Sequence, residues 1–224
     1  MIQLTEAEKQ AIKLHDNNYI NSKGARLYKE ETFEEAAEFY HLAAAMGNGH
    51  AISNLGYCYL YGRHTEQNIP LAIAYFEIAA IEHEDIDAAY KLGNIYASEK
   101  WGLKDEELSI YYYRMAATLI AGFSDESLNL IYDYNFEEFR NYPSLCLAIG
   151  KVLLEGKLAP RDIEQSYMFL LCAKDGYETQ IKNGAEFYKE PFEEVNNLLN
   201  NPDLQTLKEK EAERIKKYEQ AGED

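Results

Sequence analysis

A repeated pattern of helix signals is the feature of this 224-residue chain that most constrains its fold. Four anchor residues, each of a type that caps helix N-termini, are separated by 36, 37 and 57 positions. Each anchor is followed by a small residue four positions on, by a bulky pair seven and eight positions on, and by an alanine eleven positions on. The anchors are Thr32, Asn68, Asp105 and Asp162. The bulky pairs are Phe39-Tyr40, Tyr75-Phe76, Tyr112-Tyr113 and Phe169-Leu170.

This pattern predicts helices that pair and then stack. A second helical block precedes each anchor and contains a glycine, which lets the two helices of a pair cross closely. These glycines are Gly24, Gly56, Gly93 and Gly150. A unit of about 36 residues with two helices cannot bury its apolar face alone, so neighbouring units must cover one another. We therefore predict an all-α solenoid of antiparallel helix pairs.

The expected helix boundaries follow from the capping residues. The side-chain oxygen of each anchor can accept a hydrogen bond from an amide of the first turn, and Glu35 would complete a capping box with Thr32. Pro70 falls in the first turn after Asn68, where its missing amide hydrogen costs nothing. The glycines that follow the alanine-rich helix ends are expected at left-handed positions just beyond each helix. They are Gly47, Gly122 and Gly176.

The sequence predicts a single α-solenoid domain over residues 1–224. Thr5 and Glu8 indicate a capping helix at the N-terminal end, and Asn201-Pro202 begins the last helix. The expected divisions are 1–16 for the N-terminal cap helix, 17–122 for three regular helix-pair repeats, 123–142 for a degenerate or inserted segment, 143–176 for a further repeat and 177–224 for C-terminal capping helices. The segment 123–142 is interpreted either as a repeat that lost its second helix or as an insertion that supplies part of a binding surface.

The charge of the chain restricts the classes of partner. It carries 22 basic and 39 acidic residues, a net charge of −17, and residues 51–150 hold six Lys or Arg against fifteen Asp or Glu. A field of this sign repels nucleic acid and anionic membrane surfaces, so we expect neither as a partner. It favours a basic partner, or it merely keeps the protein in solution, and both interpretations stay open.

No residue pattern indicates catalysis. No glycine-rich phosphate loop follows a strand pattern, and the five histidines form no zinc-binding pair. Cys58, Cys146 and Cys172 stand among apolar residues and are expected to be buried thiols in a reducing compartment. The first residues lack the pattern of a secretory signal, and no apolar run approaches the roughly 18 residues that cross a bilayer. We therefore expect a bacterial cytoplasmic protein with no catalytic residue, no cofactor and no metal.

Several of these segments resemble a known repeat. The blocks Leu55-Gly56-Tyr57-Cys58-Tyr59 and Leu92-Gly93-Asn94-Ile95-Tyr96, with the loops from Gly62 to Asn68 and from Gly156 to Asp162, are similar to the Sel1-like repeat (SLR) of the tetratricopeptide-like superfamily. The second loop glycine of that family is replaced by His64 and Leu158. The resemblance implies a right-handed superhelical solenoid with the first helix of each pair on its concave face. It also implies protein–protein binding as the usual activity.

The helical period places one stripe of each first helix away from its partner helix. The polar and aromatic side chains there are not required for packing, and tyrosine is enriched at interfaces. The predicted protein-binding residues are Asn18, Asn21, Tyr28, Lys29, His50, Ser53, Tyr57, Tyr61, Asp87, Tyr90, Asn94 and Ser98. The alternative is that several of these tyrosines pack between repeats. Replacing Tyr57 and Tyr90 by alanine is expected to abolish partner capture without lowering the melting temperature.

Three functions compete on this basis. The first is a non-catalytic scaffold or adaptor that binds a peptide or protein in the concave groove. The second is an acidic immunity or inhibitor protein that masks a basic toxin or nuclease. The third, which the sequence favours least, is an enzyme or a small-ligand binder. Salt separates the first two, because a mask held by charge associates more slowly at high ionic strength. The oligomeric state is left open.

Overall fold

The computed structural model describes residues 3–121, 136–157 and 159–209. All regular structure in these ranges is helical, which confirms the predicted all-α class. The chain gathers into two compact units, Met1–Leu119 and Ile120–Asp224. The sequence predicted one continuous solenoid over residues 1–224, and that continuity stays a prediction.

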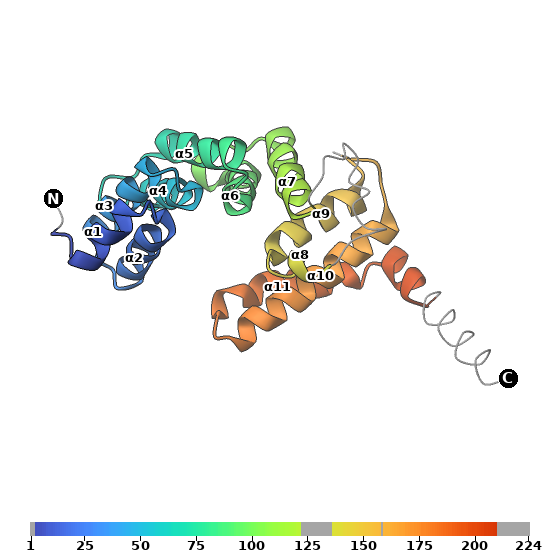
Figure 1. Cartoon of the computed structure of the whole chain (residues 1–224). Helices are drawn as coiled ribbons and strands as arrows, with labels where there is room; N and C mark the ends of the chain where they lie inside the picture. Colours follow the sequence, from blue (N-terminus) through green and yellow to red (C-terminus); the bar gives the residue numbers. More distant parts are fainter. Residues whose placement is uncertain (1–2, 122–135, 158, 210–224) are drawn as a thin grey trace. The chain divides into compact units, whose positions relative to one another are not determined.

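The first unit is built from paired antiparallel helices (Figure 1). Its helices are α1 (Glu6–Lys13), α2 (Asn17–Lys29), α3 (Phe33–Ala45), α4 (Gly49–Tyr61), α5 (Ile69–Glu82), α6 (Ile86–Ala97), the short 3-10 helix η1 (Glu99–Trp101) and most of α7 (Glu106–Ala121). The pairs are α2 with α3, α4 with α5, and α6 with α7. Each second helix also packs on the next first helix, α3 on α4 and α5 on α6, so the pairs form a continuous stack within this unit.

The second unit contains one such pair and further helices. Its described helices are α8 (Phe136–Phe139), α9 (Pro143–Glu155), α10 (Ile163–Lys182), the 3-10 helix η2 (Glu186–Tyr188) and α11 (Lys189–Leu199), and residues 202–209 are helical as well. Helices α9 and α10 pack as a pair, and α11 packs on α10. Residues 122–135 and 210–224 lie outside the described residues, so most of the segment 123–142, the glycine at 122 and the end of the predicted C-terminal capping helices lie there too.

Capping interactions confirm most of the predicted helix starts. At α1, the Glu8 amide donates to the Thr5 hydroxyl at 3.3 Å and the Thr5 amide donates to the Glu8 carboxylate at 2.7 Å, which forms the capping box. Three anchors accept a hydrogen bond from the amide three residues on, at 3.0, 2.9 and 2.9 Å. They are Asn68, Asp105 and Asp162.

Two predicted boundary features are wrong. The Thr32 hydroxyl donates to the Leu27 carbonyl at 2.9 Å, where it closes the tight turn between α2 and α3, so the capping box with Glu35 is absent. Gly176 does not follow a helix end, because α10 continues to Lys182. Its bare backbone instead lies against the carbonyl of Arg140, and a Cβ there would collide with that oxygen. Close approach, not a left-handed turn, requires this glycine.

The four first-helix glycines stand where the paired helices cross, as the sequence predicted. A Cβ built on each would meet the second member of the bulky pair, at 2.8 Å from Tyr40 and Phe76, 2.5 Å from Tyr113 and 2.8 Å from Leu170. Real Cβ atoms essentially never lie closer than 3.0 Å to a neighbour, so each position accepts only glycine without a shift. One contact therefore recurs in four repeats and fixes how closely the helices of a pair approach.

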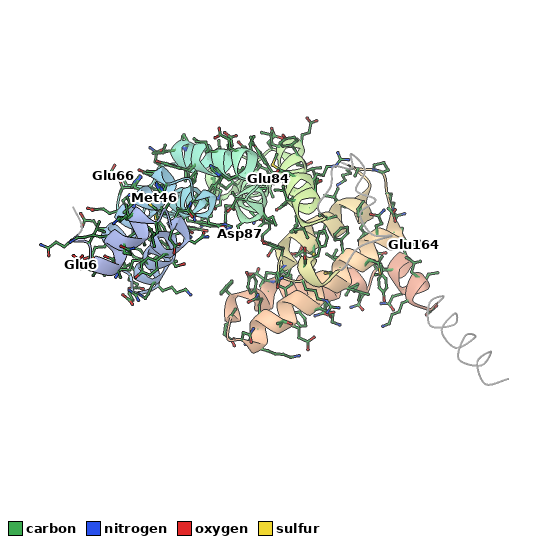
Figure 2. The ribbon with its side chains drawn as sticks, in the orientation of Figure 1. Glu6, Met46, Glu66, Glu84, Asp87 and Glu164 are labelled. Carbon is green, nitrogen blue, oxygen red and sulfur yellow. The ribbon has the colours of Figure 1, made fainter. Side chains whose placement is uncertain are left out.

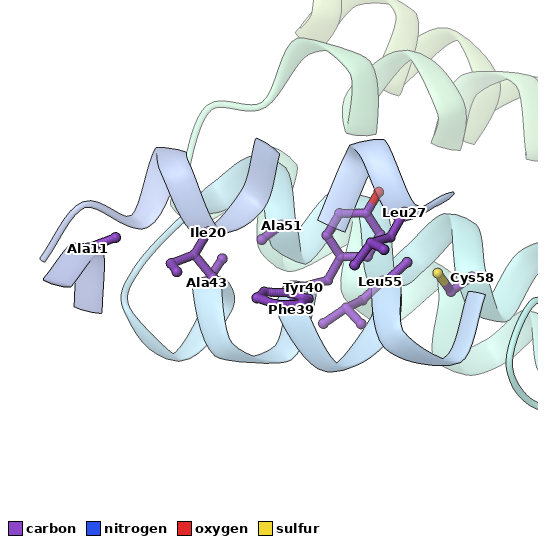
Figure 3. Packing of buried hydrophobic residues seen from close by; sticks show 10 residues of the cluster. Ala11, Ile20, Leu27, Phe39, Tyr40, Ala43, Ala51, Leu55 and Cys58 are labelled. Atoms are coloured by element: carbon purple, nitrogen blue, oxygen red, sulfur yellow. The ribbon is translucent and has the colours of Figure 1, made fainter. Parts of the chain in front are cut away.

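The core lies between the stacked helices. Figure 3 shows the first of its clusters, in which Ile20, Phe39, Tyr40 and Leu55 come together from three successive helices of the first unit. The small residues beside them, such as Ala43, are fully buried and leave room for the aromatic rings. Cys58 belongs to this cluster, and all three cysteines are free and buried, as predicted.

Candidate protein-binding surface

The twelve predicted binding residues do not form one uniformly exposed stripe. The exposed ones are Asn18, Lys29, His50, Tyr61 and Asp87, the last of which Figure 2 labels on α6. The half-buried ones are Asn21, Tyr28, Tyr57, Tyr90, Asn94 and Ser98. The expected exposure of Ser53 is wrong, because only 3% of its surface is accessible. The adjacent Asn54 donates to the Asn21 side chain of α2 at 3.0 Å, so this side of α4 faces the preceding repeat.

Some predicted polar residues connect successive first helices. Asn48 caps α4, and its side-chain amide nitrogen donates to the Asn18 side-chain oxygen at 2.9 Å. The carboxylate of Asp85, which caps α6, lies 2.6 Å from His50 Nδ1. Each cap therefore also ties its helix to the preceding first helix. The sequence analysis missed Asn48 and Asp85, although both are N-cap types directly before a first helix.

The tyrosines divide into packed and accessible ones. The Tyr57 ring lies edge-on to Phe76 of α5, with ring centres 5.0 Å apart, and Tyr90 lies 6.3 Å from Tyr113 of α7. Burial raises the pKa of the Tyr57 phenol, and the nearby Asp87 carboxylate adds to the rise. The ring of Tyr61 stacks on Tyr57 at 6.3 Å and remains 43% exposed. Of this cluster, Tyr61 therefore offers the aromatic face that a partner can reach.

A pocket of about 410 Å³ opens on the first helices of the second and third repeats. It is lined by Leu60, Tyr61, Lys91, Asn94, Ile95, Ala97, Ser98, Lys100 and Trp101. The predicted stripe supplies Tyr61, Asn94 and Ser98, which the fold brings together from α4, α6 and the residue before η1. The sequence analysis missed the two lysines and the tryptophan. The signal for Trp101 was present, because it is the only tryptophan of the chain and directly precedes a loop glycine.

Both lysines of this pocket lie over aromatic rings. Lys91 Nζ stands 5.0 Å from the ring centre of Tyr57 and 5.9 Å from that of Tyr61, while Lys100 Nζ stands 4.4 Å from the Trp101 ring. Loss of hydration raises the pKa of Asp87, a rise to which Asp85 adds and which His50 and Lys91 oppose. The pocket therefore combines positive charge with aromatic walls on an otherwise acidic surface.

A second pocket, of about 450 Å³, is acidic. It is lined by Gln3, Thr5, Glu8, Lys23, Glu34, Glu35, Glu38 and Phe39. Lys23 Nζ lies 3.3 Å from the buried Glu8 carboxylate, so this cation is already neutralised within the protein. The other acidic side chains of the wall leave the pocket with a surplus of negative charge.

The described ranges contain no group of three His, Cys, Asp or Glu residues disposed to hold a metal ion. No helix within those ranges combines the length and apolar character needed to cross a membrane. The Cys146 sulfur donates to the Phe139 carbonyl at 3.3 Å, and burial raises the pKa of this thiol. Its thiolate form is disfavoured, so this cysteine has no character of an activated nucleophile.

Comparisons with known proteins agree with this architecture. The family model of the Sel1 repeat matches residues 23–48, 49–82, 86–119 and 143–176, more than half of the chain. The crystal structure of a Sel1 repeat protein from Oxalobacter formigenes matches with a TM-score of 0.53 and 21% identity, over 69% of this chain and 57% of the other. A protective antigen of uropathogenic Escherichia coli with an SLR fold matches with a TM-score of 0.47 and 18% identity, over 88% of this chain and 52% of the other. This chain thus spans little more than half the length of either protein. No curated protein sequence matches it significantly.

Proposed function

We propose, from the premise that this chain belongs to the Sel1 repeat family, that it is a non-catalytic scaffold which holds a peptide or protein segment along helices α4 and α6. Sel1 repeat proteins are generally protein-interaction scaffolds, and the family is typically non-catalytic. The proposal adds a place on the chain where such binding occurs. That place is the surface of the first helices in the first unit.

The pocket beside Tyr61 is the observation that carries the proposal. Its lining includes Leu60 and Tyr61 from the end of α4 and the corresponding Ala97 and Ser98 from the end of α6, so the repeat contributes to it. Tyr61 and Trp101 supply aromatic surface, with their ring centres 6.4 Å apart in an edge arrangement. Aromatic residues that stay accessible beside polar groups are typical of interface hot spots.

The test is selection of binders from a random peptide library displayed on phage. Selected peptides should bind the wild-type chain, and Tyr61→Ala should weaken binding about tenfold, as the loss of an aromatic hot spot does. Tyr111→Ala is the matched control, because Tyr111 is 53% exposed but lies on α7, a second helix outside the pocket. Failure to select any peptide, or equal losses in both variants, would contradict the proposal.

A second candidate function is an acidic protein that masks a basic partner. The acidic pocket beside Glu8 and the net charge of −17 favour it. A partner of this kind would be recognised through its lysines and arginines, and its association would slow steeply as salt screens the attraction. The two candidates therefore differ in the charge of the ligand and in the response of the association rate to salt.

A further inference from the structure

Four side chains that line the pocket beside Tyr61 can donate hydrogen bonds. The Asn94 side-chain oxygen accepts a hydrogen bond from the Tyr113 hydroxyl at 2.8 Å, and the amide nitrogen of the same side chain is a donor. The Ser98 hydroxyl oxygen accepts from the Lys100 amide at 3.1 Å, so its O–H remains to donate. The ammonium groups of Lys91 and Lys100 can only donate.

Carboxylates of the protein only partly balance the charge of these two lysines, since Lys91 acts on the nearby Asp87 without forming an ion pair with it. Among the described residues, neither has a carboxylate within the 4.0 Å of an ion pair, whereas Lys104 pairs with Glu99 at 3.1 Å. Residues 51–150 contain only six Lys or Arg, and this one pocket takes two of them. Positive charge gathered where the surrounding chain is acidic indicates an anionic ligand.

We propose that this pocket binds the carboxylate of an acidic side chain, Glu or Asp, in a partner polypeptide. The inference rests on the proposed scaffold function and names the chemistry of its ligand. The carboxylate would accept hydrogen bonds from the lysines, Asn94 and Ser98, while the apolar stem of the same residue lies against Tyr61 and Trp101. The buried Leu60 and Ile95, each 1% exposed, form an apolar part of the lining.

The lining favours a carboxylate over a phosphate group. Two lysines line the pocket, and one carboxylate needs less balancing positive charge than a phosphorylated side chain, which carries about −1.5 to −2 at pH 7. Lysine acts as a point charge, which a single carboxylate can satisfy while its stem contacts the aromatic rings. Tyr61 and Trp101 both line the pocket, so a free inorganic anion would leave much of it unfilled.

The experiment uses two degenerate peptide libraries that are identical except at one central position, fixed as Glu in the first and as Gln in the second. The 224-residue chain should bind the Glu library about tenfold more tightly, the difference expected of charge-assisted hydrogen bonds. Lys91→Gln and Lys100→Gln should each remove most of this preference. Lys104→Gln should keep it, because Lys104 is paired with Glu99 and lies outside the pocket.

The outcomes separate the inference from the function on which it rests. Equal binding of both libraries, with no effect of the lysine variants, overturns the carboxylate site but leaves the scaffold function intact. Binding of neither library overturns both. Lys91→Arg keeps the charge and should keep the preference, which distinguishes loss of a ligand from loss of packing on Tyr57. A third library with phosphoserine at the central position tests the phosphate alternative, and tighter binding of this library than of the Glu library would also overturn the assignment.

Discussion

Two tyrosines of α4, one helical turn apart, have different roles. Tyr57 lies against the buried Phe76, whereas Tyr61 is 43% exposed at the mouth of the pocket. We predict that Tyr57→Ala lowers the free energy of unfolding by about 1.5–3 kcal/mol, because a largely buried ring is lost. Tyr61→Ala should stay within about 0.5 kcal/mol of the wild type. Urea denaturation followed by circular dichroism measures both, and equal losses would mean that Tyr61 belongs to the core.

This prediction revises an expectation based on the helical period alone. The period identifies the side of a helix that faces away from its partner, and it placed Tyr61, Asn94 and Ser98 where the pocket lies. It cannot state how far the partner helix or the neighbouring repeat covers that side. Ser53 is buried, and Tyr57 packs on α5, because coverage depends on the crossing of separate helices. The helical period could not identify Lys91 as a binding residue either, since an isolated lysine on a helix usually points into solvent.

At the scale of a helix, α1 is held to α2 by a buried carboxylate. The Glu8 side chain is 3% exposed, accepts the Thr5 amide at 2.7 Å and lies 3.3 Å from Lys23 Nζ. Burial raises the pKa of Glu8. The hydrogen bonds from Thr5 and the hydrogen bond and charge of Lys23 together lower it by more, so the pKa lies below its ordinary value of 4.5. The ionised form is therefore the one that the fold stabilises.

We predict that Glu8→Gln destabilises the chain by about 1 kcal/mol at pH 7. A lowered pKa contributes stability that is fully present above pH 4.5 and is lost as the pH falls through the folded-state value. The difference between wild type and variant should therefore shrink in that acidic window. Thermal melts at a series of pH values measure it. Glu6→Gln is the control: Glu6 pairs with Lys9 but is 90% exposed, so little change is expected at any pH.

The crossing of α6 and α7 gives another prediction at this scale. A methyl group at position 93 would lie 2.5 Å from the ring of Tyr113, which is 4% exposed and donates to Asn94. Alanine normally stabilises a helix by about 1 kcal/mol over glycine. We nevertheless expect Gly93→Ala to lower the free energy of unfolding by about 1–2 kcal/mol, because overpacking outweighs that gain. A double-mutant cycle in urea checks the cause. In a Tyr113→Ala background the penalty should disappear, and a penalty that persists there would point to a different clash.

The sequence predicted helices better than it predicted their ends. Recurring N-cap residues and glycines identified each helix pair, because both signals are local and repeat with the unit. The predicted end of α10 at Gly176 was wrong, since glycine serves both left-handed turns and close approaches and its neighbours alone do not distinguish the two. The structure shows the second use, against the backbone of Arg140. The missing capping box at Thr32 has a similar cause, because its hydroxyl could bond forward or backward along the chain.

At the scale of the whole molecule, two electrostatic effects of opposite sign act at different ranges. The net charge of −17 repels an approaching acidic peptide, while Lys91 and Lys100 attract its carboxylate only once it has reached the pocket. Screening removes long-range effects first: the Debye length falls from about 30 Å at 0.01 M salt to about 8 Å at 0.15 M. The response of the association rate to low salt concentrations therefore indicates whether the partner is acidic or basic.

We predict that added salt speeds the association of a Glu-containing peptide, because it screens the repulsion of the whole chain, and also speeds dissociation, because it weakens the contacts with the two lysines. Stopped-flow fluorescence with the peptide in excess measures both rate constants. The matching Gln peptide should show little change in either. A basic partner, as in the masking function, would associate more slowly as salt is added, because attraction rather than repulsion is screened. Association of a Glu peptide that slows with salt would contradict this prediction, because it would mean that the lysines attract the peptide more strongly than the whole chain repels it.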